Sequence, residues 1–244
     1  MLKIDFHIHT QEDPDNQISY SAYDVIDRAA YLHFDAIAIT NHNLLTYGND
    51  LETYAENKGV ILFPGLEQSI NHKHVLLINF SAPESLITYS DIEKTASDQT
   101  LVIAPHPFFP GMQSIGKEMY SLTRLFDAVE LCHFYCPQLN FNREAVRFSK
   151  QYGLPMIAGS DAHVWEQFGP CYSLVNSAKN KTAIIQAIKA GNVQPVAPAL
   201  TLAKMMMIYF KILKNKPTLK RSLIRIHGII NRLRHVSATR NLLK

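Results

Sequence analysis

Short apolar, β-branched segments recur along the first 160 residues, and helical patterns separate several of them. Seven such segments, each an expected strand, lie at 2–9, 35–40, 60–66, 74–80, 101–105, 127–132 and 155–160. Helical patterns begin at Ser21, Asn142 and Thr182, and Gly153 and Gly191 mark the ends of the last two. This alternation predicts a parallel α/β sheet, and seven units in about 200 residues favour a (β/α) barrel. A doubly wound open sheet is the alternative, although no glycine-rich phosphate loop follows the first strand.

The formal net charge of +3 hides an uneven distribution of charge along the chain. Residues 1–166 hold all 21 Asp and Glu residues and 10 of the 24 Lys and Arg residues, and the other 14 basic residues follow Glu166. From about Pro198 the sequence becomes amphipathic and basic, and Pro217 separates two expected helical stretches. We therefore expect a barrel domain at 1–197 and a basic amphipathic helical extension at 198–244.

Three roles fit this extension. The apolar spacing of Leu202, Met205 and Tyr209 favours a helix that covers the barrel. The lysines and arginines would also suit contacts with nucleic acid phosphates or with an anionic membrane surface. A third role is the electrostatic steering of an anionic substrate toward the barrel.

Cysteine usage and the N-terminal residues bear on the compartment. Cys132, Cys136 and Cys171 are too few for a disulfide framework. The chain starts without a cationic region followed by an apolar segment, and no 18-residue stretch is free of charged and strongly polar residues. We therefore expect a cytoplasmic protein.

Histidines and carboxylates mark the ends of the expected strands. His7 and His9 alternate along the first strand, so both imidazoles share a face and can reach one metal ion. Similar residues stand at the ends of other strands, namely His42, Glu67, His74, His106, Asp161 and His163. Histidines that merely fill a core would be scattered with respect to strand ends. The pattern therefore predicts a metal cluster where the strands end.

The ligand types indicate the metal and its chemistry. Imidazole nitrogen and carboxylate oxygen together suit zinc, manganese or iron better than magnesium, and a carboxylate such as Glu67 can bridge two ions. We therefore expect two or three divalent cations. Such a cluster activates water and polarises a phosphoryl oxygen, so that no serine or cysteine nucleophile is needed. Hydrolysis of a phosphate ester is the predicted reaction.

The order of these motifs resembles that of the PHP (polymerase and histidinol phosphatase) family. The segments that carry the resemblance, which covers about residues 1–196, are DFHIHT, AITNHN, PGLE, the lone His74, APHP, the VEL strand and GSDAH. The resemblance implies a distorted seven-stranded (β/α) barrel with a trinuclear metal centre. It also implies a hydrolase, since the family includes phosphatases, exonucleases and polymerase-associated domains.

Carried over to this sequence, the resemblance assigns ligands to three metals. The first would be held by His7, His9, Glu67 and Asp161. The second would share Glu67 and add His74 and His106. The third would take His42, His163 and a residue just after the first strand.

The last of these ligands is where the sequence departs from the family spacing. The usual position, five residues beyond His9, is Pro14, and Asp13 and Asp15 flank it. We favour Asp15, because Ser19 follows it at the distance of a serine that caps the next helix; Asp13 is the alternative. Asn41 also stands where the family usually has aspartate. Its amide can orient His42 but adds no negative charge, which would weaken the third site.

Two histidines are the expected catalytic residues. His133, just beyond the VEL strand, is a candidate phosphate ligand or general acid. His163 would act beside it as a metal ligand within the reacting centre. The predicted substrate is a phosphomonoester of a nucleotide or another phosphorylated small molecule.

Three other functions stay open at this point. A 5′–3′ exonuclease or phosphodiesterase would use the same cluster, with the basic extension holding nucleic acid. An amidohydrolase also carries two alternate histidines on its first strand, but no candidate bridging lysine is present at the fourth strand. A non-catalytic binding module is the last alternative, and the near-complete ligand set argues against it.

Overall fold

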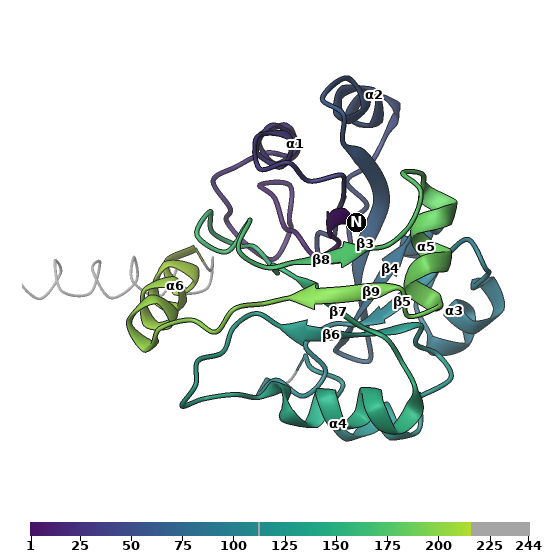
Figure 1. Ribbon diagram of the computed structural model, residues 1–244, viewed down its shortest axis with the longest axis vertical. Coiled ribbons are helices and arrows are strands. Elements are labelled where there is room, and N and C mark those ends of the chain that lie inside the picture. Colours follow the sequence, from purple (N-terminus) through teal and green to yellow (C-terminus); the bar gives the residue numbers. More distant parts are fainter. Residues whose placement is uncertain (112, 216–244) are drawn as a thin grey trace, which may run out of the picture.

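The computed structural model describes residues 1–111 and 113–215. One mixed sheet of nine strands, in the order β7-β6-β5-β4-β3-β2-β1-β8-β9, curls into a nearly closed, barrel-like form (Figure 1). The strands are β1 Leu2–Asp5, β2 Ala36–Ile39, β3 Ile61–Ile70, β4 Lys73–Ile78, β5 Leu101–Ala104, β6 Ala128–Cys132, β7 Met156–Gly159, β8 Tyr172–Val175 and β9 Val193–Val196. The helices of the described residues are α1 Ala22–Tyr31, α2 Asn49–Asn57, α3 Tyr89–Thr95, α4 Asn142–Tyr152, α5 Lys181–Lys189 and α6 Leu202–Asn215.

The sheet is α/β as expected, but it is not wholly parallel. Neighbouring strands from β1 to β3 and from β5 to β7 run parallel, whereas β4 is antiparallel to both β3 and β5. Asn71 and His72 form the turn between β3 and β4 with φ of 49° and 63°. Two consecutive positive φ values are typical of a type I′ hairpin turn, which requires an antiparallel pair.

Each of the seven expected segments overlaps a strand, and two further strands were missed. The expected seven-stranded barrel is therefore wrong in its strand number. β8 and β9 form an antiparallel pair that follows β7, and β8 is antiparallel to β1. Both are four residues long, and β9 contains Pro195, which is tolerated there because β9 is the edge of the sheet.

Side chains and backbone close the sheet between β7 and β8. The Ser173 hydroxyl on β8 accepts a hydrogen bond from the Ala158 amide at 2.7 Å and donates one to the Ala158 carbonyl at 3.0 Å. Beyond the strand ends, Ile8 and Ala162 form an isolated bridge, and the His9 amide donates to the Ala162 carbonyl at 3.2 Å. The ends of the first and seventh strands are thereby brought side by side.

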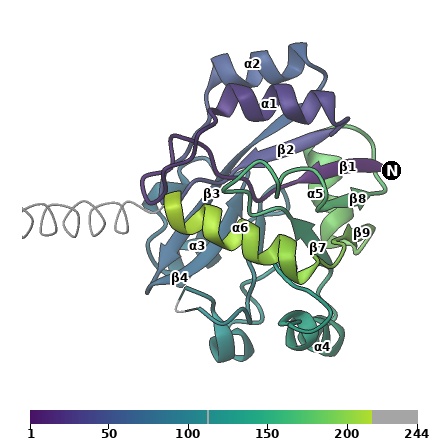
Figure 2. The ribbon, with the colours of Figure 1, turned by 90° about the vertical axis from the view of Figure 1, so that its left-hand side faces the viewer.

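Three apolar clusters pack the two faces of the sheet. The inner cluster includes Phe6, Phe63 and Leu76 and continues to α5. A second cluster includes residues of α1 and α2, and a third includes residues of α3 and α4. The helices α1 and α2 lie on one side of the sheet and α4 lies on the other (Figure 2). The α1 helix begins with a capping box in which Ser21 and Asp24 bond each other's backbone, so Ser21, rather than Ser19, is its N-cap.

Helix α6, the described part of the basic extension, lies beside one end of the sheet (Figure 2). Met205 and Ile208 are buried, and Lys211 pairs with Glu166. The Asn215 carbonyl accepts a hydrogen bond from the Gln17 amide at 3.0 Å. The helix thus covers part of the barrel. The second expected helical stretch, after Pro217, lies outside the described residues, and the boundary at 197/198 stays a prediction.

Among residues 1–111 and 113–215, no helix combines the length and the apolar character that a membrane crossing requires.

Replacement of Ser173 by alanine tests how the sheet closes. The substitution leaves the buried Ala158 amide and carbonyl without their side-chain partner, so we expect the free energy of unfolding to fall by about 1–3 kcal/mol. Denaturant unfolding followed by circular dichroism measures this change. Ser81→Ala, at an exposed position, should change it by less than about 0.5 kcal/mol. Equal effects of the two substitutions would contradict the closure.

Candidate metal centre

The Glu67 carboxylate on β3 is the centre of a ring of histidines. Its Oε1 lies 2.8 Å from Nδ1 of His74, 3.4 Å from Nε2 of His106 and 3.5 Å from Nε2 of His7, and its Oε2 lies 3.1 Å from Nε2 of His42 and 3.3 Å from Nε2 of His9. The Asp161 Oδ1 lies 3.3 Å from Nε2 of both His7 and His9. Residues from five regions of the chain thus converge on one point.

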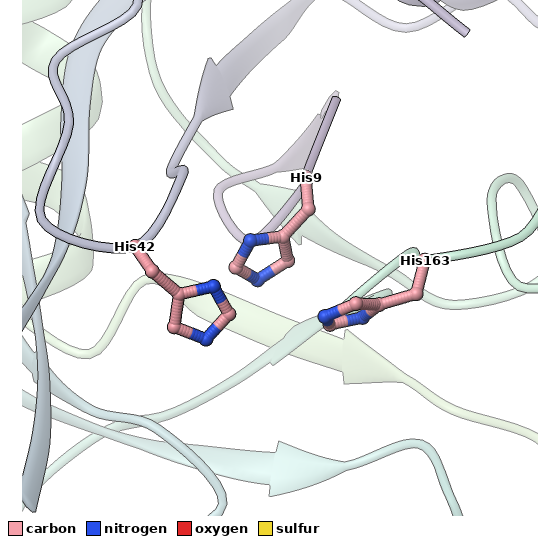
Figure 3. A group of neighbouring side chains, drawn as sticks. All are labelled: His9, His42 and His163. Atoms are coloured by element: carbon pink, nitrogen blue, oxygen red, sulfur yellow. The ribbon is translucent and has the colours of Figure 1, made fainter. Parts of the chain in front are cut away.

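The ring divides into four overlapping groups whose ligand atoms lie within 4.8 Å of one another. These groups are His7, His9 and Asp161; His7, Glu67 and His106; His42, Glu67 and His74; and His9, His42 and His163. The rings of the last group face one another around a common space (Figure 3). The structure therefore brings together every expected ligand except Asp15.

The backbone presents most of these side chains just beyond the ends of strands, whereas Glu67 and His74 lie within β3 and β4. His7 and His9 are fully buried and follow β1, with Ile8 between them in the apolar cluster on the opposite face. His106 and Asp161 have φ of 31° and 45°, in the left-handed region that residues other than glycine rarely adopt. Backbone strain of this kind persists where surrounding structure enforces it, which is common at functional sites.

An outer set of hydrogen bonds orients the histidines. His7 Nδ1 donates to Glu130 Oε1 at 2.9 Å, and the other oxygen of Glu130 accepts from the His106 amide at 3.0 Å. His9 and His42 both donate from Nδ1 to Asp13 Oδ2 at 2.8 Å. With Nδ1 protonated, each of these rings keeps a lone pair on Nε2 for a metal ion.

His106 and His163 are held in the same way. His106 Nδ1 donates to the Ser114 hydroxyl at 3.3 Å, and Ser114 in turn donates to the His106 carbonyl at 3.0 Å. His163 Nδ1 donates to the Asp161 carbonyl at 3.0 Å. Their Nε2 atoms are thus also left with a free lone pair.

Several buried polar atoms at the centre lack a hydrogen-bond partner among the described residues. They are Nε2 of His7, Nε2 of His9, both ring nitrogens of His74 and Oε1 of Glu67. Buried polar groups are almost always satisfied, because burial without a partner costs free energy. Imidazole nitrogens and carboxylate oxygens that are free and convergent fit divalent cations such as zinc, manganese or iron.

The charges of the cluster are strongly coupled. Burial alone would raise the pKa of Glu67, but His74, His7 and His42 outweigh it, and its pKa lies well below the usual range. Burial alone would lower the pKa of His7, but Glu130 and the other carboxylates hold it well above the usual range. Protons and metal ions therefore compete for the same nitrogens.

Asp15, the preferred ligand, lies outside the four groups of candidate ligands, so the geometry does not support that assignment. Its side chain is exposed on the rim of the cavity, and its amide donates to Asp13 Oδ1 at 2.8 Å. Asp13 is buried and accepts the Nδ1 protons of His9 and His42, so it orients two rings. The argument from Ser19 failed because a different serine caps α1.

Asn41 also has a different role from the expected one. Its amide donates to the hydroxyls of Thr10 and Thr46 at 2.8 and 2.7 Å, and its oxygen accepts from the Thr10 amide at 2.8 Å. Asn41 therefore secures the chain beside the first strand. Asp13, rather than Asn41, orients His42.

The cluster forms the floor of a cavity of about 640 Å³. His133, one of the expected catalytic residues, lines this cavity together with His163. Phe109 and Phe134 contribute an apolar wall, and Tyr209 and Ile212 of α6 complete it. The helical extension is thus part of the site. The sequence did not point to Gln167, which lines the cavity. It also did not point to Glu130 and Ser114, which hydrogen-bond His7 and His106.

A family model described as PHP-associated matches residues 140–193, which include β7, Asp161 and His163. The match adds to the ligand order that resembles this family along the preceding residues. Over this segment the chain is therefore similar to the PHP family.

Two uncharacterized proteins of Methanocaldococcus jannaschii resemble this chain in sequence. One is 26% identical over 152 residues, which span 55% of this chain and 83% of the relative. The other is 24% identical over 173 residues, which span 68% of this chain and 67% of the relative.

Solved structures share the fold of this chain. They include a protein of Bifidobacterium adolescentis described as a metal-dependent phosphoesterase, with 13% identity, 66% of this chain and 87% of that chain covered, and a TM-score of 0.50. An amidohydrolase of Chromobacterium violaceum is 13% identical, with 79% of this chain and 97% of that chain covered and a TM-score of 0.50. The lesion-specific endonuclease EndoQ of Pyrococcus furiosus is 17% identical, with 80% of this chain and 57% of that chain covered and a TM-score of 0.54.

Paired substitutions distinguish Asp13 from Asp15. Both rings bond Oδ2 of Asp13, and Oδ1 accepts from the Asp15 and Asn16 amides. The amide nitrogen introduced by Asp13→Asn must face one of these two sets of donors, so we expect metal affinity to fall by about 10- to 100-fold. Asp15→Asn, the matched control on the rim, should leave the affinity unchanged. Competition with a chromogenic chelator measures both. A larger loss from Asp15→Asn than from Asp13→Asn would restore the sequence-based assignment.

Proposed function

We propose that this chain is a metal-dependent phosphoesterase that hydrolyses a phosphomonoester of a nucleotide or another small molecule. The observation that carries the proposal is the convergence of unpartnered Nε2 and carboxylate atoms around Glu67. Two or three divalent cations, manganese, zinc or iron, fit this donor set. The hydrolytic class is also supported by the three neighbours whose names state an activity, since a phosphoesterase, an amidohydrolase and an endonuclease are all hydrolases.

The residues of the chain would divide the work. His7, His9, His42, Glu67, His74, His106, Asp161 and His163 would hold the cations. Bound cations activate water, polarise a phosphoryl oxygen and stabilise the leaving oxygen. Glu130 and Asp13 would keep the rings oriented, and His133 would contact the substrate from the cavity wall.

Nucleophilic catalysis by cysteine is disfavoured at this site. Cys132 lines the cavity, but burial raises the pKa of its thiol, and the nearby Glu130 and Asp161 raise it further. A thiol of raised pKa supplies little thiolate at neutral pH. Water is therefore the proposed nucleophile.

The position of α6 favours a small substrate over a polymer. Tyr209 and Ile212 close one side of the cavity, and its volume of about 640 Å³ is that of a small-molecule site. The buried side chains of Met205 and Ile208 hold the helix in place. A nucleic acid strand that reached the cluster from that side would have to displace it.

A nuclease is the second candidate, because the fold is shared with an endonuclease and 14 basic residues follow Glu166. This chain spans only 57% of that endonuclease. Nucleic acid binding by the basic extension would weaken steeply with salt, whereas phosphomonoester hydrolysis would not require it.

Hydrolysis of matched aryl phosphate monoester and diester substrates tests the proposal. We expect protein loaded with manganese to prefer the monoester, and chelator treatment or Glu67→Gln to lower kcat/KM by on the order of 1000-fold or more. Glu93→Gln, at an exposed position on α3, is the control and should keep full activity. Turnover that survives the loss of Glu67 and of metal would contradict the proposal, and preference for the diester would favour the nuclease.

The role of α6 is tested by trimming its contribution to the cavity. Tyr209→Ala removes part of the wall, so we expect kcat/KM for a bulky bis-aryl diester to rise about 10-fold relative to the monoester. Tyr31→Ala, which removes an exposed tyrosine on α1, should leave the ratio unchanged. An unchanged ratio in Tyr209→Ala would mean that α6 does not select the substrate.

A further inference from the structure

Gln167 is a buried side chain whose orientation is fixed by the backbone around it. Its Oε1 accepts hydrogen bonds from the amides of His163 and Val164 at 3.0 and 3.1 Å. An amide oxygen can accept two hydrogen bonds, whereas the amide nitrogen can only donate. The nitrogen therefore lies on the other side, where it donates to the Asp161 carbonyl at 2.9 Å.

This orientation determines the protonation of His133. The Gln167 Nε2 lies 3.0 Å from the His133 Nε2, so two nitrogens face each other. Because the Gln167 nitrogen can only donate, the contact is a hydrogen bond only when the His133 nitrogen accepts. In the neutral ring the proton must then be on Nδ1.

The Nδ1 atom of His133 has no hydrogen-bond partner among the described residues. The side chain is only 6% exposed, yet it lines the same cavity as Glu67 and Asp161. A buried donor without a partner is uncommon, because its desolvation is not offset. An acceptor brought by a bound ligand would offset it.

Burial supports the neutral form of this ring. It lowers the pKa of His133 to about 4, although Asp161 and Glu130 act in the opposite direction. A histidine that is neutral at pH 7 has little capacity to act as a general acid, but it can still donate from its one protonated nitrogen.

We propose that Gln167 is a positioning residue that holds His133 as the neutral Nδ1–H tautomer, which donates a hydrogen bond to a phosphoryl oxygen of the substrate. The assignment rests on the proposed function for the substrate, but the tautomer itself does not depend on it. The sequence suggested two roles for His133, a phosphate ligand or a general acid. The neutral tautomer is compatible with the first role and not with the second.

Nitrogen NMR of the full chain, labelled with ¹⁵N-histidine and loaded with zinc, tests the tautomer. The couplings of the two ring nitrogens to the ring protons identify which one is protonated, and His133→Phe assigns the signal by its loss. We expect the proton on Nδ1. A wild-type ring protonated on Nε2, or on both nitrogens at neutral pH, would overturn the proposal without any reference to activity.

Inorganic phosphate tests the donor role in the same sample. Binding should shift the Nδ1–H resonance of His133. Calorimetry or displacement of an aryl phosphate shows whether phosphate binds. If phosphate binds and this resonance stays unchanged, the donor role is overturned. This test stays valid if no esterase activity is found, so failure of the proposed function and failure of the donor role can be distinguished.

Gln167→Glu tests the positioning role with little change in shape. One carboxylate oxygen can still accept from the His163 and Val164 amides, but the other now faces His133 as an acceptor and draws the proton to Nε2. We expect kcat/KM to fall by about 10- to 100-fold, the range for a hydrogen bond to a charged group. The NMR signal should report the moved proton.

A double-mutant cycle separates positioning from a merely structural role. If Gln167 acts through His133, Gln167→Glu should cause no further loss in a His133→Phe background. Independent, multiplicative losses would overturn the positioning role. If Gln167→Glu does not fold, the wild-type tautomer and its response to phosphate still decide the proposal.

Discussion

The structure depends on a set of buried carboxylates and imidazoles that satisfy one another only in part. Glu67 lies among five histidines, and several of the nitrogens that face it have no hydrogen-bond partner in the part of the chain that the structure describes. In a medium of low polarity such groups are costly unless opposite charge is supplied. A divalent cation supplies that charge and uses the free lone pairs. The rest of the barrel must therefore offset the free energy that is lost when these donors are buried together.

Hydrogen bonds from carboxylates around the cluster hold the donors in place. Glu130 reaches His7 and the His106 backbone, and Asp13 reaches His9 and His42, so each carboxylate fixes two elements at once. The end of β7 is equally confined. A Cβ atom on Gly159 would lie 2.6 Å from Glu130 Oε1 and 2.7 Å from the His7 Cβ, so only glycine lets the three strands approach this closely. The close approach and the shared carboxylates keep the inner ligands in register.

Much of the site could be predicted from the sequence, because strand ends and ligand types are local features. The run His7-Ile8-His9 needs only strand periodicity, Asp161 follows a recognisable strand, and Glu67 extends another, since β3 continues to Ile70. Strand periodicity could not assign the roles of Asp13, Glu130 and Gln167, because these roles include contacts with His42, His7 and His133, which lie far away in the sequence. It also missed β8 and β9, which are short and gain their stability from pairing with β1 and with each other. The direction of β4 was missed because the turn at Asn71 and His72 carries no glycine signal.

The measurement that tests the central claim most directly is anomalous X-ray scattering from crystals of the full chain supplied with zinc, with data collected on both sides of the zinc edge. The account predicts at least two peaks around Glu67, each about 2.0–2.2 Å from histidine nitrogens or carboxylate oxygens of the cluster. Peaks confined to other parts of the molecule, with the cluster free of anomalous density at saturating zinc, would contradict it.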